Sequence, residues 1–377
     1  MKYIFRSILL LVLIVFNISA YSESNDTKEN KLKILYYNSE NPEGFCWRTS
    51  SEFMQAACQN LGMELNIVYV DRDAAFMIND FKKKAGALDK PDAVIFQNLK
   101  SNAVNMLNIA EENKIPAFIF NAGLTEEQAK QFGNPREKFK YWIGQILPDD
   151  KKAGYDLAFQ LFNEAKRLGL KDKNGNIHFL SIIGTKTDAA SIERENGLKL
   201  ASQQEKKIIL DQITSANWDR SEAEKSLNWL ILRYPEAKVV WAANDLMALG
   251  ALDSFSKSQL LPGKNIIVGS MDWVPEALKQ VQNGKLYTSL NGHFIETAWA
   301  SVLVYDYLNK KDFASEKTSF NSKMTVLSKS NINLYLKNFK PENFKKINFS
   351  IFSKVKNKNL KKYDFNFDVV LKKIISN

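Results

Sequence analysis

The clearest candidates for binding chemistry are four polar residues, Asn121, Asn244, Asp272 and Asn291, which end or closely follow short apolar runs. An asparagine amide both donates and accepts hydrogen bonds, and an aspartate accepts them from hydroxyl groups. Ligands of open α/β sheets bind beyond the carboxyl ends of the strands. If the apolar runs are strands, these side chains can bind a small polar molecule. The alternative is that Asn244 and Asp272 cap helices and that Asn121 and Asn291 merely terminate strands.

Residues for catalysis are scarce. The two histidines, His178 and His293, have no nucleophile near them in the sequence. The patterns HExxH, GxSxG, CxxC, GxGxxG and the P-loop do not occur. Two histidines and two cysteines that lie far apart do not predict a metal site. We therefore expect no enzyme activity, no cofactor and no metal, although catalytic groups can also converge from distant segments.

The segments that must position these residues alternate between strand-like and helical patterns. Several strand-like runs are rich in Ile, Val and Phe without alternation, which is typical of parallel strands buried on both faces. The alternation predicts doubly wound α/β sheets, and 377 residues with 45% hydrophobic content suffice for two of them. The predicted strands are 32–37, 65–70, 93–97, 117–121, 177–183, 207–213, 239–243, 266–269 and 286–290, and the predicted helices include 50–61, 103–113, 151–168 and 246–256.

The N-terminus has the pattern of a secretory signal peptide. Residues 1–6 are short and basic, residues 7–16 are almost wholly apolar, and residues 17–20 end in the small residue Ala20. The apolar run is shorter than the ~20 residues of a membrane span. No cysteine lies at the cleavage region, which disfavours a lipid anchor there. We predict a signal peptide over residues 1–20 and export to the periplasm.

The net charge narrows the classes of binding partner. The formal charge of +10 is spread along the chain and is densest near the C-terminus. We interpret it as a solvated lysine-rich surface rather than a nucleic-acid or membrane-binding surface.

The two cysteines do not predict a disulfide. Residues 49–52 form a capping box, which predicts a helix start with Cys58 some 13 Å along the helix. Cys46 precedes that start, and a disulfide needs Cα atoms within ~7 Å, so we expect two free, mostly buried thiols.

Four segments resemble the ribose-binding group of sugar-type periplasmic binding proteins, in the order and spacing of that family. They are residues 191–198 (SIERENGL), 216–220 (ANWDR), 242–251 (AANDLMALGA) and 269–272 (GSMD). The resemblance covers nearly the whole chain after the predicted leader. Residues 41–48 (NPEGFCWR) and 291–294 (NGHF) also resemble the autoinducer-2-binding branch, which serves a sensor kinase rather than a transporter.

The resemblance implies the type I fold of this family, with two Rossmann-like lobes, three hinge crossovers and the ligand between the lobes. By matched position the crossings fall near Leu147, Asn291 and Lys323. The N-terminal lobe is then 31–147 plus 292–323, and the C-terminal lobe is 148–291 plus 324–377. Residues 324–377, which we call the strap, exceed what a plain sugar binder needs. We expect the strap to pack over the C-terminal lobe, with a docking surface as the alternative, through Phe339, Phe344, Phe349, Phe352, Tyr363 and Phe365.

The resemblance also assigns roles to individual residues. Phe45 and Trp47, in the loop after the first strand, would stack on one face of the ligand, and Trp218 would cover the other. The polar residues that would bind the ligand's hydroxyls are Asn121, Arg194, Asn244, Asp272 and Asn291. This chemistry suits a pyranose or furanose ring, with its apolar C–H faces and edge hydroxyls.

Each of these roles has a plainer alternative. Trp47 and Trp218 could be core residues, and Arg194, which lies between two glutamates, could form a surface ion pair. Two features also depart from the family. Asn121 stands where ribose-type binders have an aspartate, and residues 45–47 hold an extra residue between the paired aromatics. For these reasons we do not assign ribose as the ligand.

Two main hypotheses for function follow, each with a monomer that has no nucleic-acid partner. In the first, the protein captures a sugar and delivers it to the membrane permease of an ABC transporter. In the second, it presents a signal molecule to a membrane sensor kinase. Both use closure of the lobes, driven by differential affinity for the ligand. A third hypothesis is an exported enzyme on a similar fold. A cytoplasmic repressor would need an N-terminal helix-turn-helix, where this chain has the export pattern.

Overall fold

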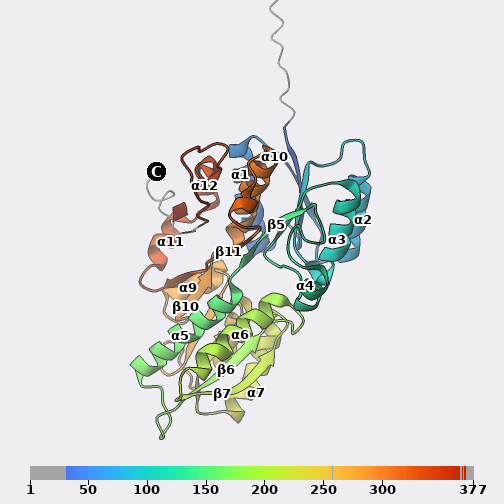
Figure 1. Ribbon diagram of the computed structural model, residues 1–377. Coiled ribbons are helices and arrows are strands. Elements are labelled where there is room, and N and C mark those ends of the chain that lie inside the picture. Colours follow the sequence, from blue (N-terminus) through green and yellow to red (C-terminus); the bar gives the residue numbers. More distant parts are fainter. Residues whose placement is uncertain (1–30, 257, 366, 368, 371–377) are drawn as a thin grey trace, which may run out of the picture. The chain divides into compact units, whose positions relative to one another are not determined.

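The computed structural model describes residues 31–256, 258–365, 367, 369 and 370, and only the backbone of Phe45, Cys46 and Pro341. The predicted signal peptide, residues 1–20, lies outside the described residues. Two six-stranded, mostly parallel sheets organise the rest (Figure 1). Each sheet carries helices on both faces, which confirms the predicted α/β class with two lobes.

All strands of the N-terminal sheet run parallel to their neighbours. Successive residues of its strand β1 (Lys33–Asn38) enter different cores. Ile34 and Tyr36 pack with α1 (Phe45–Leu61) and α10 (Glu296–Leu308). Leu35 and Tyr37 pack with α2 (Ala74–Ala85) and α3 (Ala103–Asn113). Burial on both faces explains why the run lacks alternation. In spatial order the strands are β11 (Ser319–Ser322), β5 (Trp142–Pro148), β4 (Ala117–Phe120), β3 (Ala93–Phe96), β1 (Lys33–Asn38) and β2 (Glu64–Tyr69).

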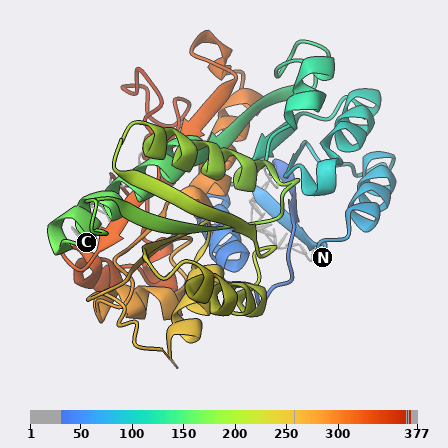
Figure 2. The same ribbon diagram turned by 90° about the horizontal axis from the view of Figure 1, so that it is seen from below.

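The C-terminal sheet is parallel except for β12, which pairs antiparallel with β10. Helices α5 (Asp150–Leu168) and α6 (Ala189–Gln203) pack together (Figures 1 and 2). Helices α7 (Arg220–Arg233) and α8 (Asp245–Phe255) form a second packed pair. In spatial order the strands are β12 (Thr325–Ser328), β10 (Thr288–Asn291), β9 (Ile267–Met271), β8 (Ala237–Ala242), β6 (Ile177–Ile183) and β7 (Ile208–Ser215).

The helices begin and end at recognisable signals. The side chains of Asp149 and Asn244 cap α5 and α8, and Gly62 and Gly169, both with left-handed φ, end α1 and α5. The helices are α1 (Phe45–Leu61), α2 (Ala74–Ala85), α3 (Ala103–Asn113), α4 (Glu126–Phe132), α5 (Asp150–Leu168), α6 (Ala189–Gln203), α7 (Arg220–Arg233), α8 (Asp245–Phe255), α9 (Pro275–Gln282), α10 (Glu296–Leu308), α11 (Ile332–Asn338) and α12 (Pro341–Phe344), with short 3-10 turns η1 (Leu99–Ser101), η2 (His293–Ile295), η3 (Phe313–Ser315) and η4 (Phe349–Phe352).

The predicted start of α1 was wrong. The helix begins at Phe45, so the residues interpreted as its capping box lie inside it, and Thr49, Ser50 and Ser51 are buried. Ser51 accepts a hydrogen bond from Asn38 at 2.8 Å, and Ser50 bonds Thr297 at 3.1 Å. Tertiary hydrogen bonds therefore occupy the polar side chains that the sequence pattern indicated as the N-terminal cap of the helix. Cys46 consequently lies within α1 rather than before it, and Cys58 is a free, buried thiol.

The chain passes between the sheets three times: after Pro148, after Asn291, and between Ser322 and Thr325. The sequence does not predict three strands, β5, β11 and β12. Strand β5 includes Gly144, where a Cβ would collide with Phe313 and the Thr318 carbonyl. Strands β11 and β12 have four residues each and lie at sheet edges, so they are too short to give a hydrophobic pattern.

The strap does not stay on the C-terminal lobe, which corrects the expected arrangement. Its first part, β12 and α11, packs on β10 and α9 of that lobe. Its later part, α12 and η4, packs instead on α1 and α10 of the N-terminal lobe. Of the six strap aromatics that the sequence analysis named, four are buried, which confirms packing as the role of Phe344, Phe349, Phe352 and Tyr363. The strap therefore links both lobes.

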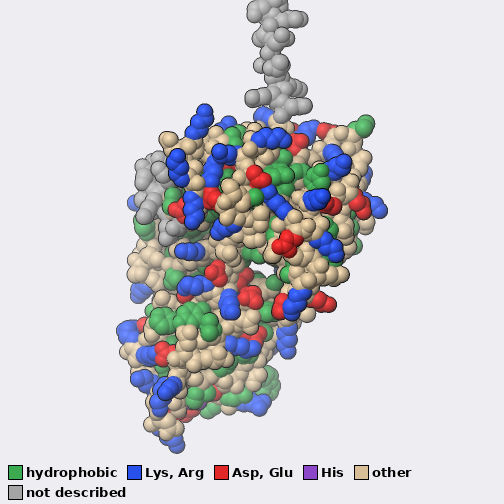
Figure 3. All heavy atoms as spheres, in the orientation of Figure 1, with side chains coloured by type: hydrophobic (Ala, Val, Ile, Leu, Met, Phe, Trp, Pro, Cys, Tyr) green, Lys and Arg blue, Asp and Glu red, His purple; other side chains and the backbone are tan. Residues whose placement is uncertain are grey.

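Basic and acidic side chains are interspersed over the face shown in Figure 3, as expected for a solvated charged surface. Among the helices of the described residues, none has the length and apolar content needed to cross a bilayer.

Candidate ligand-binding cleft

A cleft of about 840 Å³ lies at the carboxyl ends of strands from both sheets. Six of the eight predicted site residues line it, and the two lobes contribute them together. The six are Trp47, Asn121, Arg194, Trp218, Asn244 and Asp272. The side chain of Phe45, the seventh, is not described. Its backbone and that of Trp47 lie in the first turn of α1 rather than in the predicted loop.

Arg194 is the buried centre of the C-terminal wall. Its Nε donates to Asp150 Oδ1 at 2.7 Å, and its Nη1 donates to the Ala243 carbonyl at 2.7 Å. Two glycines bring α5 and α6 close enough for this pairing. A Cβ at Gly154 would collide with the Arg194 backbone, and one at Gly197 would collide with the backbone of α5. The arginine is therefore no surface ion pair but a fixed donor at the cleft wall.

Asp272 lies beside Arg194, with Oδ1 3.7 Å from Arg194 Nη1. Burial raises the pKa of Asp272 to about 7, against the opposing effect of Arg194 and with support from the charges of Asp150 and Glu40. His293 Nε2 is 4.0 Å from the same carboxylate oxygen. Burial, followed by the charge of Arg194, lowers the pKa of His293 to about 3, so its imidazole is neutral. The neutral imidazole of His293 can therefore donate and accept hydrogen bonds without adding charge to the cleft.

Two tryptophans form aromatic walls of the cleft, one from each lobe. Trp47 packs edge-on against Phe120, with ring centroids 6.0 Å apart. Trp218 donates from Nε1 to Asp188 Oδ2 at 2.7 Å, and the Arg194 guanidinium lies 5.8 Å from its ring. Both are half-buried and line the cleft. An aromatic ring with one face toward a cleft suits the C–H face of a sugar ring.

The amide side chains serve two purposes at once. Asn121 accepts from Gln97 Nε2 at 3.1 Å. Asn244 caps α8 by accepting from the Met247 amide at 2.9 Å, so the capping alternative holds for a residue that also lines the cleft. Because its oxygen serves the cap, its NH₂ group is the part suited to a ligand.

Asn291 is not among the cleft-lining residues, contrary to expectation. It is fully buried, and its amide donates to the Asp272 carbonyl. Its oxygen accepts from the amides of Gly292 at 2.6 Å and His293 at 3.2 Å. The NH₂ group and the oxygen of the Asn291 amide are thus both bonded to backbone groups at a hinge crossover. Asn291 therefore supports Asp272 from behind.

Strained backbone is concentrated in the cleft. Of the twelve non-glycine residues with positive φ in the described chain, seven line the cleft. Such conformations persist only where surrounding structure enforces them, and they gather at functional sites. The seven are Arg72, Lys100, Ser101, Asn121, Asn217, Trp218 and Asp272.

The sequence analysis missed several lining residues. Gln97 and Asn98 directly follow β3, so the rule that selected Asn121 would also have selected them. Glu40 and Arg72, which lie 3.6 Å apart as an ion pair, come from loops after β1 and β2 that carry no recognisable pattern. Asp188 was missed because its role, to hold the Trp218 indole, depends on a contact across thirty residues.

The other histidine lies elsewhere. His178 is near the amino end of β6, where it contacts Asp211 at 2.9 Å and Asp172 at 3.4 Å. Over the residues that the structure describes, no cluster of three or more His, Cys, Asp or Glu is arranged to hold a metal ion.

Comparison with known proteins points to one family. The family description "periplasmic binding protein domain" matches residues 37–312. A galactofuranose-binding protein of Escherichia coli (strain K12) is 28% identical over 134 residues, 34% of this chain and 42% of that protein. The ribose import binding protein of Bacillus subtilis (strain 168) is 24% identical over 227 residues, 60% of this chain and 65% of that protein. These alignments span less than two thirds of either relative.

A solved structure matches more completely. A periplasmic sugar-binding protein from Pseudomonas fluorescens is 28% identical, with a TM-score of 0.80, and the match covers 90% of this chain and 99% of that chain. The relatives named here are binding proteins rather than enzymes.

Proposed function

Because this chain belongs to the periplasmic binding protein family, we propose that it captures a small sugar or polyol in the cleft and delivers it to the membrane permease of an ABC-type importer. The observation that carries the proposal is the pairing of two aromatic walls, Trp47 and Trp218, with a buried arginine–aspartate group at one cleft. Aromatic faces and edge hydrogen bonds together match a ring that has C–H faces and hydroxyl edges.

The charges of the cleft favour a neutral ligand. Arg194 is already compensated by Asp150 at 2.7 Å, and Arg72 by Glu40 at 3.6 Å. The Asp188 carboxylate accepts from the Trp218 indole. A charged ligand that pairs with either arginine would have to displace its carboxylate partner and leave that partner without compensation. Hydroxyl groups can instead use the remaining donor and acceptor positions of the same side chains.

Capture works through the two lobes. A ligand that first binds one wall gains the contacts of the other wall when the lobes close, so the closed state is populated by its differential affinity. The permease then recognises the closed form. The cleft holds its ligand by hydrogen bonds and stacking, and we propose no bond-breaking step.

The alternative of a receptor for a sensor kinase is not favoured, because the relatives are sugar-binding and sugar-import proteins. We further propose that the protein acts in the periplasm as a monomer after cleavage near Ala20. N-terminal sequencing of the protein from a periplasmic extract tests the cleavage. A mature chain that still begins at Met1 would contradict it.

Thermal unfolding of the chain from Tyr21 onward tests the ligand class. The panel contains D-ribose, D-allose, D-galactose, xylitol, myo-inositol, a nucleoside and autoinducer-2. A ligand at 1,000-fold over its Kd stabilises by about 4.1 kcal/mol, which moves the midpoint by several degrees. The expected result is a shift with a sugar or polyol. Trp218→Ala should abolish that shift, whereas Trp229→Ala, at an exposed tryptophan on α7, should retain it.

Two outcomes would overturn the proposal. A shift with autoinducer-2 alone would favour the receptor alternative. A protein that is purified by unfolding and refolding, and so is free of carried-over ligand, but responds to no sugar or polyol would exclude this ligand class.

A further inference from the structure

Trp273, the residue after Asp272, combines full burial with a strained backbone conformation. Trp273 is fully buried behind the cleft wall, and both residues have positive φ, 116° for Asp272 and 58° for Trp273. A side chain with a Cβ is strained in this region of backbone conformation. Two strained residues in succession need neighbours that enforce the conformation.

Strap residues supply much of that enforcement. The Trp273 ring contacts Tyr335 edge-on, with ring centroids 4.6 Å apart, and Phe367 at 5.6 Å. Phe339 adds a further edge contact at 6.5 Å and stacks on Tyr335 at 4.4 Å. The same rings reach the hinge, because Phe294 in η2 contacts Phe339 at 5.2 Å and Phe367 at 5.4 Å.

The backbone around Trp273 is also held by hydrogen bonds from buried polar groups. Asn291 donates to the Asp272 carbonyl, and the Val274 amide donates to Asp245 Oδ2 at 2.7 Å. The Trp273 indole itself donates to the Ser289 carbonyl at 2.9 Å. The loop is thus fixed at its two ends by polar contacts and at its centre by the aromatic rings of the strap.

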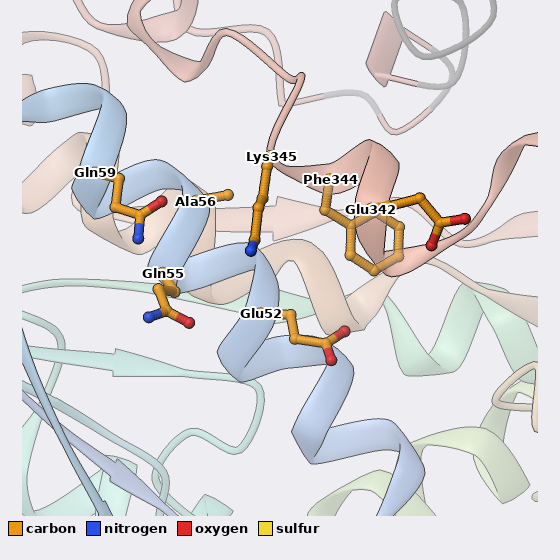
Figure 4. Close-up of a pocket in the computed structure, with 7 residues that line it drawn as sticks. All are labelled: Glu52, Gln55, Ala56, Gln59, Glu342, Phe344 and Lys345. Carbon is orange, nitrogen blue, oxygen red and sulfur yellow. The ribbon is translucent and has the colours of Figure 1, made fainter.

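The strap is in turn anchored to the N-terminal lobe. Phe344 stacks on Phe53 of α1 with ring centroids 4.2 Å apart, and the Phe349 amide donates to Asn60 of the same helix at 2.9 Å. Figure 4 shows Phe344 and Lys345 of the strap facing α1 across a small pocket of about 360 Å³.

A buried carboxylate on α10 secures the next part of the strap. Asp306 accepts from the Lys354 amide at 2.6 Å and from the Tyr363 hydroxyl at 2.7 Å. The rings that hold Trp273 of the C-terminal lobe therefore belong to a segment fastened to the N-terminal lobe.

We propose that the strap is a positioning element for ligand binding: through Trp273 it holds Asp272 in the conformation that accepts a ligand hydroxyl. Tyr335 is the central positioning residue, because its ring lies nearest Trp273 among the strap contacts described. This inference rests on the proposed function for the ligand class, but the mechanical coupling it describes can be measured without a ligand.

The first experiment compares three variants of the chain from Tyr21 onward by isothermal titration with D-ribose, D-allose and myo-inositol. Tyr335→Leu removes the ring against Trp273, and we expect affinity to fall about tenfold, the equivalent of releasing one strained residue. Tyr335→Phe keeps the ring and should bind as the unmodified protein does. Phe352→Leu is the matched control, because Phe352 is also a buried strap ring but packs on Trp299. It should lower the unfolding midpoint and leave affinity unchanged.

A double-mutant cycle then separates positioning from general loosening. If the strap acts through Asp272, Tyr335→Leu should have no further effect on affinity in the Asp272→Asn background. Equal losses in both backgrounds, or a loss in Phe352→Leu as large as in Tyr335→Leu, would overturn the proposal.

A ligand-free measurement decides the matter if none of the three probes binds. Carboxyl NMR, with Asp272 assigned by its loss in Asp272→Asn, follows the pKa of Asp272, which burial raises to about 7 beside Arg194, Asp150 and Glu40. A relaxed loop exposes the carboxyl, so Tyr335→Leu should lower this pKa, and Phe352→Leu should not. An unchanged Asp272 titration in Tyr335→Leu would refute the strap's role. Failure of all probes with a shifted titration would instead count against the sugar assignment alone.

Discussion

Substitution of Gly184 by alanine should weaken ligand binding by moving a neighbouring aromatic wall. Gly184 follows the last residue of β6, and a Cβ built there would lie well inside contact distance of the Trp218 ring. Its φ is outside the left-handed region, so alanine fits the backbone. The ring must therefore withdraw, by roughly 1 Å or more, to restore a normal carbon–carbon separation of about 3.5 Å.

The displacement has two costs for binding. It breaks or lengthens the hydrogen bond from Trp218 Nε1 to Asp188, now 2.7 Å, which contributes about 1 kcal/mol. It also misaligns the stacking face, worth about 1 kcal/mol. Together these predict an affinity loss of about 30-fold, measured by isothermal titration with the sugar that stabilises the unmodified protein.

The matched control is Gly86→Ala, where the nearest atom to a new Cβ is a carbonyl oxygen at 3.6 Å, an ordinary contact. It should bind normally. If Gly184→Ala also binds normally while folded, then Trp218 does not form a binding wall, and the assignment of the cleft's aromatic face is wrong.

Three further predictions concern buried charges. Affinity should fall up to tenfold per pH unit below the pKa of Asp272, raised mainly by burial to about 7, because the protonated carboxyl is a poorer acceptor for a hydroxyl; a flat titration series from pH 5 to 8 would contradict this. Arg194→Ala should abolish binding and lower the free energy of unfolding by about 3–5 kcal/mol, because it leaves Asp150 buried without its partner. Adding Asp150→Ala should restore the urea midpoint but not binding, and restored binding would exclude Arg194 from the site. Burial raises the pKa of Glu296 well above its usual value of 4.5, against its hydrogen bond with Ser322, so this group makes the protein lose stability as pH rises above about 4.5. Glu296→Gln should therefore raise the unfolding midpoint at pH 7 and flatten its pH dependence, whereas a lower midpoint would contradict the raised pKa.

The sequence predicts the cleft well where the site depends on strand ends. Asn121, Asn244 and Asp272 follow buried parallel strands, and the carboxyl ends of such strands face the cleft. The same rule fails at Asn291, because β10 ends in a hinge crossover where the amides of Gly292 and His293 need an acceptor. Nothing in the residue type distinguishes an asparagine that meets a ligand from one that meets the backbone.

The strap shows why other features are beyond a sequence pattern. Its aromatic residues indicate burial, but they do not say against which lobe. The answer depends on contacts between residues far apart in the chain, such as Phe349 with Asn60, 289 positions away. The early start of α1 has a related cause, because Ser50 and Ser51 form tertiary hydrogen bonds in place of a helix cap.

The strained cleft loops have a consequence for how selectivity arises. Sugars that differ in one hydroxyl are separated only if donors and acceptors stay in place when the wrong sugar enters, so that a mismatched group is left without a partner. Here Trp218 is fixed by Asp188, Asn244 by its helix cap, and Asp272 by Asn291 and the hinge. Groups that are ordered before the ligand arrives lose little freedom on binding. The strain is therefore consistent with a cleft that gains both affinity and discrimination from order imposed by the fold rather than by the ligand.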